Sequence, residues 1–359
     1  MQKTEEFLRS LARPAIRDIE PYDASVDGNP LIRVSANENN EGLPEPVLAA
    51  MRNALTEGNR YPDSRSTSLR KKLAERFSLR PEQIITANGL DGLFTMLGRA
   101  FLDPGDEVVC GECTFGVYAE TALIAGASVK TVPLGEGYTQ LPADFADAAG
   151  PATKMLFFCN PNNPTGTLAE AAAVHEMLKK IPRRVIVILD EAYLDFTDAD
   201  GSASFKLLEE FPNLVICRTF SKIFALAGLR VGWAAAHPAL LDCLYRVREP
   251  YCVTAVSEAG AYAALEEEEH LRKTRTMIAG EREKLCSLLC RLGVKYIPSQ
   301  TNFVMIFPQE RYDPLSAAFI QSGIAVRRLS LHGERVMRFS VGLPEEIRQV
   351  ERVLEEIFA

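Results

Sequence analysis

Short apolar runs alternate with segments of helical spacing through the first two thirds of the chain. The apolar runs have the length of buried strands and lie at residues 84–87, 107–110, 129–132, 155–159, 185–189 and 214–217. The helical segments lie before and between them, at residues 46–55, 66–77, 89–101, 115–125 and 168–180. Buried strands separated by helices predict an α/β fold with a mostly parallel sheet covered by helices on both faces.

The pattern changes after Trp233. We expect helices at residues 256–265, 270–292, 314–321 and 344–358, and strands at residues 294–297, 303–307, 324–328 and 336–341. This order predicts a smaller α+β domain. A chain of 359 residues exceeds one ordinary core. We therefore expect an N-terminal arm at residues 1–30, a large domain at 31–250 and a small domain at 251–359.

Composition and charge narrow the class of protein. Hydrophobic residues make up 47% of the chain and charged residues 25%, as in ordinary globular proteins. The net charge is −8 and no long basic block occurs, so we expect no nucleic-acid partner. No apolar run reaches the ~20 residues that cross a bilayer, and residues 1–10 lack an apolar signal core. We therefore expect a cytoplasmic protein without membrane contact.

The cysteines and histidines do not indicate a metal site. Cys110 and Cys113 form a CxxC without a second pair, and we interpret them as two unpaired thiols at a strand end. All eight cysteines lie scattered through apolar stretches, which fits reduced and mostly buried thiols. The four histidines are not clustered, so we expect no metal.

The most informative stretch runs from Arg218 to Gly232 and contains Lys222. A lysine held near apolar groups loses proton affinity and becomes a usable amine nucleophile, as Schiff-base chemistry on a carbonyl requires. Thr219, Ser221 and Arg230 flank this lysine with two hydroxyls and a guanidinium, which suit a phosphate dianion. An aldehyde beside a phosphate is the chemistry of pyridoxal phosphate. The alternative is a surface lysine with a nearby salt-bridged arginine.

Two loops that follow predicted strands could bind the same ligand. Residues 88–92 open a helix after a strand, and backbone N–H groups at a helix N-terminus bind phosphate. Residues 160–166 contain two prolines and a glycine, and Asn163 among them could donate to a phenolate oxygen of a cofactor ring. The alternative for both loops is ordinary turn chemistry.

Asp190 ends the predicted strand at residues 185–189. A buried aspartate needs a cation, which a protonated pyridine nitrogen would supply. Tyr193 could reach the ring hydroxyl, and Phe115 could stack on the ring face. The alternatives are a helix N-cap for Asp190 and a core position for Phe115.

Together these motifs resemble the fold-type I, pyridoxal-phosphate-dependent aminotransferases. Within that family the pattern is most similar to the histidinol-phosphate aminotransferases. The resemblance covers nearly the whole chain. The matching segments are residues 19–22, 37–38, 60–63, 160–166, 190–193, 218–232 and 338–342. The family fold that it implies has a large domain, with a mostly parallel sheet covered by helices, and a smaller α+β domain.

The resemblance also implies a role for each matching residue. Lys222 carries the cofactor as a Schiff base, Asp190 pairs with the pyridine nitrogen, and Phe115 stacks on the ring. Asn163 and Tyr193 contact the ring oxygen. The phosphate is held by Ser221, Arg230, Thr219 and the amides of Leu90 and Asp91. Tyr61 of a partner subunit reaches this phosphate, which implies a homodimer with shared active sites. The substrate-binding residues are Arg338, Arg327, Tyr22 and Asn37.

The implied reaction is transamination between small-molecule amines and oxo acids, here histidinol phosphate and 2-oxoglutarate. An aromatic amino-acid aminotransferase and a threonine-phosphate decarboxylase remain alternatives because they share the cofactor site. A cofactor-binding module without catalysis is the alternative from another class. Three positions depart from the family pattern: Asn40 and Cys113 each replace a proline, and residues 89–92 read Gly-Leu-Asp-Gly.

Overall fold

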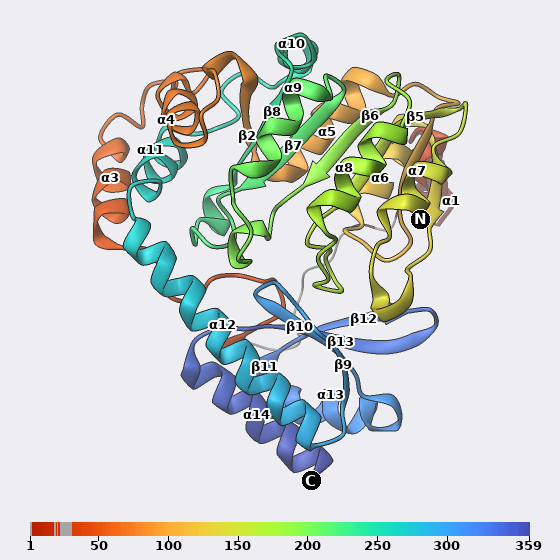
Figure 1. Cartoon of the computed structure of the whole chain (residues 1–359), viewed down its shortest axis with the longest axis vertical. Helices are drawn as coiled ribbons and strands as arrows, with labels where there is room; N and C mark the ends of the chain where they lie inside the picture. The colour runs from red at the N-terminus through yellow and green to blue at the C-terminus, as the bar shows by residue number, and fades with distance from the viewer. Residues whose placement is uncertain (1, 18, 20, 22–30) are drawn as a thin grey trace.

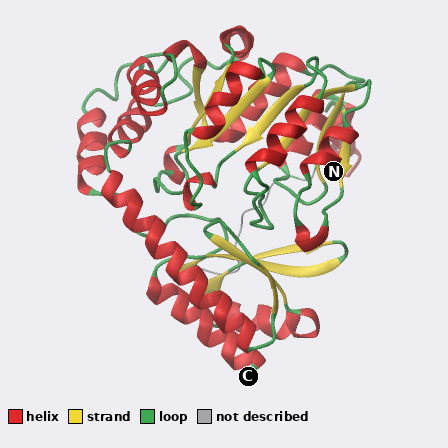
Figure 2. Ribbon diagram, viewed as in Figure 1, coloured by secondary structure: helices red, strands yellow, loops and turns green. Residues whose placement is uncertain are grey.

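The computed structural model describes the chain except residues 1, 18, 20 and 22–30. A larger unit is built on a seven-stranded sheet and a smaller unit on a four-stranded sheet, and the long helix α12 (Glu268–Arg291) runs between them (Figure 1). Figure 2 shows helices on both faces of the larger sheet, whereas helices cover one side of the smaller sheet.

The larger sheet has the strand order β2-β8-β7-β6-β5-β3-β4. Its strands are β2 (Ile84–Asn88), β3 (Glu107–Gly111), β4 (Ser128–Val132), β5 (Thr153–Cys159), β6 (Ile186–Asp190), β7 (Leu214–Thr219) and β8 (Val231–Ala236). The pairs among β3 to β7 are parallel, and β8 is antiparallel to both β2 and β7. The expectation of a mostly parallel sheet is confirmed.

Side chains along each strand alternate between two cores. On β5, Leu156 and Phe158 enter the core under α7 (Pro142–Ala148), α8 (Ala171–Lys180) and α9 (Leu207–Glu210). Phe157 enters the opposite core under α5 (Gly89–Phe101), α6 (Val117–Ala125) and α10 (Pro238–Val247). Because both faces are buried, the strands read as continuous apolar runs instead of alternating ones.

The smaller sheet has the order β12-β13-β10-β9 and is antiparallel throughout. Its elements are β9 (Lys295–Ile297), β10 (Phe303–Phe307), β12 (Arg327–Leu331) and β13 (Glu334–Ser340), with α13 (Tyr312–Gln321) and α14 (Pro344–Phe358). Beside it, β1 (Ile32–Arg33) pairs in parallel with β11 (Ile324–Ala325). The remaining α-helices are α1 (Gln2–Ser10), α2 (Pro14–Arg17), α3 (Glu45–Leu55), α4 (Thr67–Phe77) and α11 (Ala255–Ala264).

Most predicted elements are present, with two exceptions of substance. The expectation of one strand at residues 324–328 is wrong, because these residues divide between β11 and β12 in different sheets. The sequence also did not predict β8, α7, α9 or α10. β8 contains Gly232 and the alanines at 234–236, which carry weak strand preference. The helix expected from residue 115 begins at Val117.

The division of the chain at residues 31 and 250 stays a prediction. Two contacts bear on where such boundaries would fall. β1 lies within the proposed large domain but pairs with β11 of the smaller unit. Conversely, α11 lies within the proposed small domain but packs against α3 and α4 (Figure 1).

The eight cysteines are all free thiols, as expected. The expectation that most are buried is wrong, since only Cys110, Cys159 and Cys217 are buried. Within the described residues, no group of three or more histidine, cysteine, aspartate or glutamate side chains is arranged to hold a metal ion. None of the described helices has the length and apolar character that crossing a bilayer requires.

Gly232 sets how closely β8 approaches the start of α5. A Cβ added there would lie 2.8 Å from the carbonyl carbon of Gly89 and 2.9 Å from the nitrogen of Leu90, and neither backbone atom can rotate away. Gly232→Ala should therefore destabilise the protein by about 1–3 kcal/mol. The measurement is the free energy of unfolding from urea titrations.

Gly280→Ala is the matched control, because no described residue beyond its own helical turns comes within 4 Å of a Cβ at that position in α12. Alanine is the better helix former, so this variant should gain about 0.5–1 kcal/mol. A Gly232→Ala variant as stable as the unaltered protein would contradict the close approach of β8 to α5.

Candidate active site

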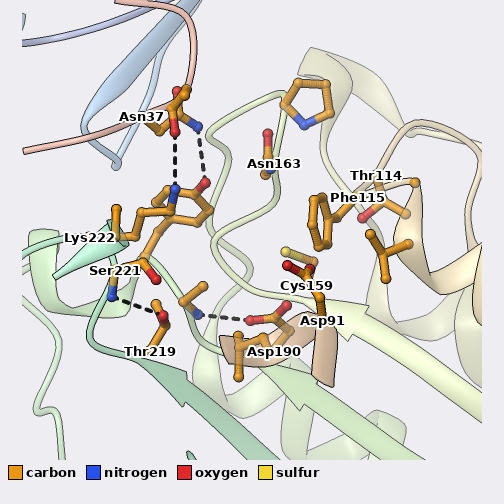
Figure 3. A pocket seen from close by; sticks show the side chains of 18 of the residues that line it. Asn37, Asp91, Thr114, Phe115, Cys159, Asn163, Asp190, Thr219, Ser221 and Lys222 are labelled. Carbon is orange, nitrogen blue, oxygen red and sulfur yellow. Dashed lines mark hydrogen bonds between the residues drawn. The ribbon is translucent and has the colours of Figure 1, made fainter. Parts of the chain in front are cut away.

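A cavity of about 620 Å³ opens beyond the carboxyl ends of β5, β6 and β7. Most residues expected at a site line its wall, and Figure 3 shows many of them around it. They are Asn37, Leu90, Asp91, Phe115, Asn163, Asp190, Tyr193, Thr219, Ser221, Lys222, Arg230, Arg327 and Arg338. The topology explains the convergence, because parallel strands bring the loops that follow them to one edge of the sheet.

Lys222 lies between the two units of the structure. Its Nζ donates to the carbonyl oxygen of Ala36 at 3.1 Å and lies 5.6 Å from the centre of the Tyr193 ring. Burial lowers the pKa of Lys222 to about 8, and the charge of Arg338 acts in the same direction. About one tenth of such amines are unprotonated at pH 7, far more than for an ordinary lysine.

Asp190 ends β6 and is only 2% exposed. Its Oδ1 accepts the N–H of Ala192 at 2.9 Å, and its Oδ2 accepts the hydroxyl of Tyr118 at 2.5 Å. Burial raises the pKa of Asp190 to about 6. Within the described part of the chain no cationic side chain forms an ion pair with it. The alternative of a helix N-cap is wrong, because the next helical turn (Leu194–Phe196) begins after Tyr193.

A set of donors suited to an anion, the anion cradle, lines the cavity at the N-terminus of α5. Arg230 packs so closely on Gly89 that a Cβ on Gly89 would lie 2.4 Å from its Nη2. The same nitrogen is 2.9 Å from Oδ2 of Asp91. Thr219 Oγ1 accepts the backbone N–H of Ser221 at 3.0 Å, which fixes the loop before Lys222. Helix amides, hydroxyls and a guanidinium form a donor set suited to a phosphate.

Tyr193 and Asn37 form a buried pair beside Lys222. Asn37 Nδ2 donates to the Tyr193 hydroxyl at 3.0 Å (Figure 3). Burial raises the pKa of Tyr193 to about 12. Asn37 adopts the left-handed region with φ 56°, and its backbone is held by Ser340 and Asn302 of the smaller unit. The tyrosine hydroxyl is therefore neutral and positioned by both units.

Two arginines of the smaller sheet line the opposite wall. Arg327 on β12 and Arg338 on β13 are direct cross-strand neighbours. Arg338 donates to Oδ1 of Asn163 and, at 2.8 Å, to the carbonyl oxygen of Ser35. Like charges on facing positions repel each other, so an anion between them would be stabilising.

Among the described residues expected at the site, Tyr61 does not line this cavity. Tyr61 is 81% exposed and stacks on Tyr251, with ring centres 4.5 Å apart. Tyr22 lies outside the described residues. Tyr118, Glu38 and Glu120 also line the cavity and were not expected there from the sequence. Tyr118 follows Phe115 by three residues in a segment read as helix, so this spacing could have indicated it.

The geometry thus places a lysine of lowered pKa, a buried carboxylate and a set of donors suited to an anion around one cavity. Residues 29–357 match the model of the family described as aminotransferase class I and II. The chain belongs to this family.

Relatives that the chain matches over most of its length include histidinol-phosphate aminotransferases. The chain is 39% identical to a histidinol-phosphate aminotransferase of Methylobacillus flagellatus, over 91% of this chain and 89% of that protein. It is 35% identical to one of Symbiobacterium thermophilum, over 96% of this chain and 98% of that protein. The solved histidinol-phosphate aminotransferase of Sinorhizobium meliloti, in complex with pyridoxal 5'-phosphate, matches with a TM-score of 0.89 and 25% identity. That match covers 97% of this chain and 98% of the other.

The lowered pKa of Lys222 predicts a pH dependence of its reactivity. In protein freed of cofactor, reductive methylation of Lys222 should rise with pH and level off above a midpoint near pH 8, since only the free amine reacts. Pulse labelling followed by peptide mass spectrometry measures this. Peptides with exposed lysines are the internal reference, and their labelling should keep rising toward pH 10. A midpoint near 10 for Lys222 would contradict the environment described here.

Proposed function

We propose that this protein is a pyridoxal-phosphate-dependent aminotransferase whose substrates are histidinol phosphate and 2-oxoglutarate. One observation carries the proposal: Lys222, the buried carboxylate of Asp190 and the anion cradle at α5 surround a single cavity. The cofactor has an aldehyde, a basic ring nitrogen and a phosphate, and each group matches one of these three features. The names of the relatives support the same substrate.

Different residues of the cavity would bind different parts of the cofactor. Thr219, Ser221, Arg230 and the amides of Leu90 and Asp91 hold the phosphate, and Asp190 holds a proton on the ring nitrogen. Asn163 and Tyr193 donate to the ring oxygen, and Phe115 covers the ring face. When bound, the cofactor supplies the aldehyde that captures amines and a ring that accepts electrons from the substrate carbon.

Lys222 has two tasks in this proposal. Its amine would hold the cofactor until a substrate amine took its place. Once free, Nζ would accept a proton from the substrate carbon, which its pKa of about 8 permits near neutral pH. Tyr193, Asn37 and the carbonyl oxygen of Ala36 orient this nitrogen.

Arg327 and Arg338 would bind the anionic end of both substrates. A phosphate dianion takes charge-assisted contacts from two guanidiniums, and the carboxylates of 2-oxoglutarate can use the same donors. Tyr22 is proposed as a further substrate contact by family resemblance. The free thiols suit a reducing compartment, so we propose a cytoplasmic location.

The first test compares substrates on one preparation. Histidinol phosphate should give a higher kcat/KM than phenylalanine, which lacks a phosphate for Arg327 and Arg338, and than threonine phosphate, because the names of the relatives point to histidinol phosphate. Dephosphorylated histidinol should lose roughly 10- to 100-fold in kcat/KM, since each charged contact is worth about 1.5–3 kcal/mol.

Arg338→Lys is the informative variant for this test. It keeps the charge but loses the bidentate donors, so the preference for histidinol phosphate over histidinol should shrink. A higher kcat/KM for phenylalanine would identify an aromatic aminotransferase. Carbon dioxide release from threonine phosphate would identify a decarboxylase.

We further propose a homodimer in which Tyr61 completes the partner's phosphate cradle. The pair of Tyr61 and Tyr251 supports this, because these two large aromatic rings are exposed on the surface, as is Leu55 at the end of α3. A two-fold arrangement would bury the same patch on both copies.

Mixing inactive subunits tests the shared site. Lys222→Ala and Tyr61→Ala proteins should each have little activity alone. After subunit exchange, about one quarter of all sites should combine Lys222 from one chain with Tyr61 from the other. Activity assays before and after exchange measure the recovery. Lack of recovery despite exchange, verified by differently tagged subunits, would argue for separate sites.

A further inference from the structure

A hydrogen bond beneath the cavity joins two residues that are far apart in the sequence. Tyr118, in the first turn of α6, is fully buried and donates to Oδ2 of Asp190 at 2.5 Å. Its ring stacks on Phe157 of β5, with centres 4.6 Å apart and planes 11° apart. Phe94 and Phe115 meet the same ring edge to face. The aromatic packing leaves the phenol little freedom to point elsewhere.

The position of Asp190 explains why this donor matters. Its two oxygens each accept one protein donor, the phenol on Oδ2 and the N–H of Ala192 on Oδ1. Cys159 and Cys217 are its partners on the neighbouring strands, and neither is a strong donor. Tyr118 is thus the one side-chain hydroxyl among the described residues that hydrogen-bonds this carboxylate. The titratable groups facing Asp190 are Tyr118, Cys159, Cys217, Glu191, Asp91 and Tyr193.

We propose that Tyr118 is a positioning residue, whose hydroxyl keeps the Asp190 carboxylate ionised and turned toward the ring nitrogen of the cofactor. This inference rests on the proposed function, because the ring nitrogen belongs to pyridoxal phosphate. Tyr118 touches neither the ring nitrogen nor the substrate in this role. It acts through Asp190.

The hydroxyl of Tyr118 should lower the pKa of Asp190. Burial raises the pKa of this carboxyl to about 6, and the bonds from Tyr118 and Ala192 oppose that rise because they favour the charged form. Without the hydroxyl, the pKa of Asp190 would rise further. The carboxyl would then be protonated over more of the neutral range, and a neutral carboxyl cannot stabilise a protonated pyridine nitrogen.

The test is the affinity of cofactor-free protein for pyridoxal phosphate, measured by absorbance titration from pH 5 to 9. Tyr118→Phe keeps the ring packing and removes the hydroxyl. Its affinity at pH 7 should fall roughly 10- to 100-fold, the loss of one charge-assisted hydrogen bond. The pH below which affinity declines should also move upward relative to the unaltered protein, since ionised Asp190 is required for binding.

Two further variants distinguish an effect of Tyr118 on the charge of Asp190 from a purely structural effect. Tyr138→Phe is the matched control, because it also removes a hydrogen-bonded hydroxyl. Lys295 Nζ donates to that hydroxyl at 2.6 Å, and Tyr138 does not line the cavity. This variant should leave the pH profile unchanged. In an Asp190→Asn background, Tyr118→Phe should have almost no further effect on affinity, because the charge that the phenol stabilises is already gone.

Failure of the proposed function and failure of the inference about Tyr118 give different results. If the unaltered protein does not bind pyridoxal phosphate, the proposed function itself fails. If it binds and Tyr118→Phe binds equally well with the same pH profile, the inference about Tyr118 is overturned. It is also overturned by a pH-independent loss that persists in the Asp190→Asn background. Should Tyr118→Phe not fold, 3-fluorotyrosine at position 118, a stronger donor, should move the decline to lower pH, and no movement would overturn the inference.

Discussion

The desolvation of one carboxylate governs this structure. Asp190 lies at the end of β6 with almost no exposed surface, and within the described structure only the phenol of Tyr118 and one backbone N–H replace the water it has lost. Isolated buried carboxylates are costly, so the arrangement is favourable only when a cation sits beside it. The rest of the larger unit places further groups for the same ligand beside this carboxylate. Loops that follow three strands bring Lys222, Asn163 and the donors at the start of α5 to the same edge of the sheet.

Local pattern was enough to predict the sheet and the strand-end residues. Runs such as residues 155–159 are apolar on both faces because α-helices cover both, and that produces a signal readable over five residues. The same signal fails for β8. Its small residues let the strand pass close to the start of α5, as the contact between Gly232 and Gly89 demands, and small residues carry little strand preference.

Contacts between distant segments were beyond the sequence. Tyr118 and Asp190 meet because α6 packs on the sheet that carries Asp190. The residues next to each of them in the sequence do not indicate this contact. Likewise, Arg338 could be assigned to a substrate only through family resemblance. Its bonds to Ser35 and Asn163 depend on how the smaller sheet closes over the larger unit. The residue types at the site were therefore predictable, whereas the partners that set their orientation were not.

The left-handed backbone of Asn37 has a consequence for how this protein can change over time. Glycine would accept the φ of 56° but would lose the amide that meets Tyr193, and most other side chains would strain the backbone. Aspartate would fit the conformation but would replace the amide donor with a negative charge beside a neutral phenol. Each of these substitutions thus loses either the backbone conformation or the amide donor to Tyr193, while Ser340 and Asn302 hold the backbone of position 37. One backbone angle therefore restricts which residues position 37 can accept.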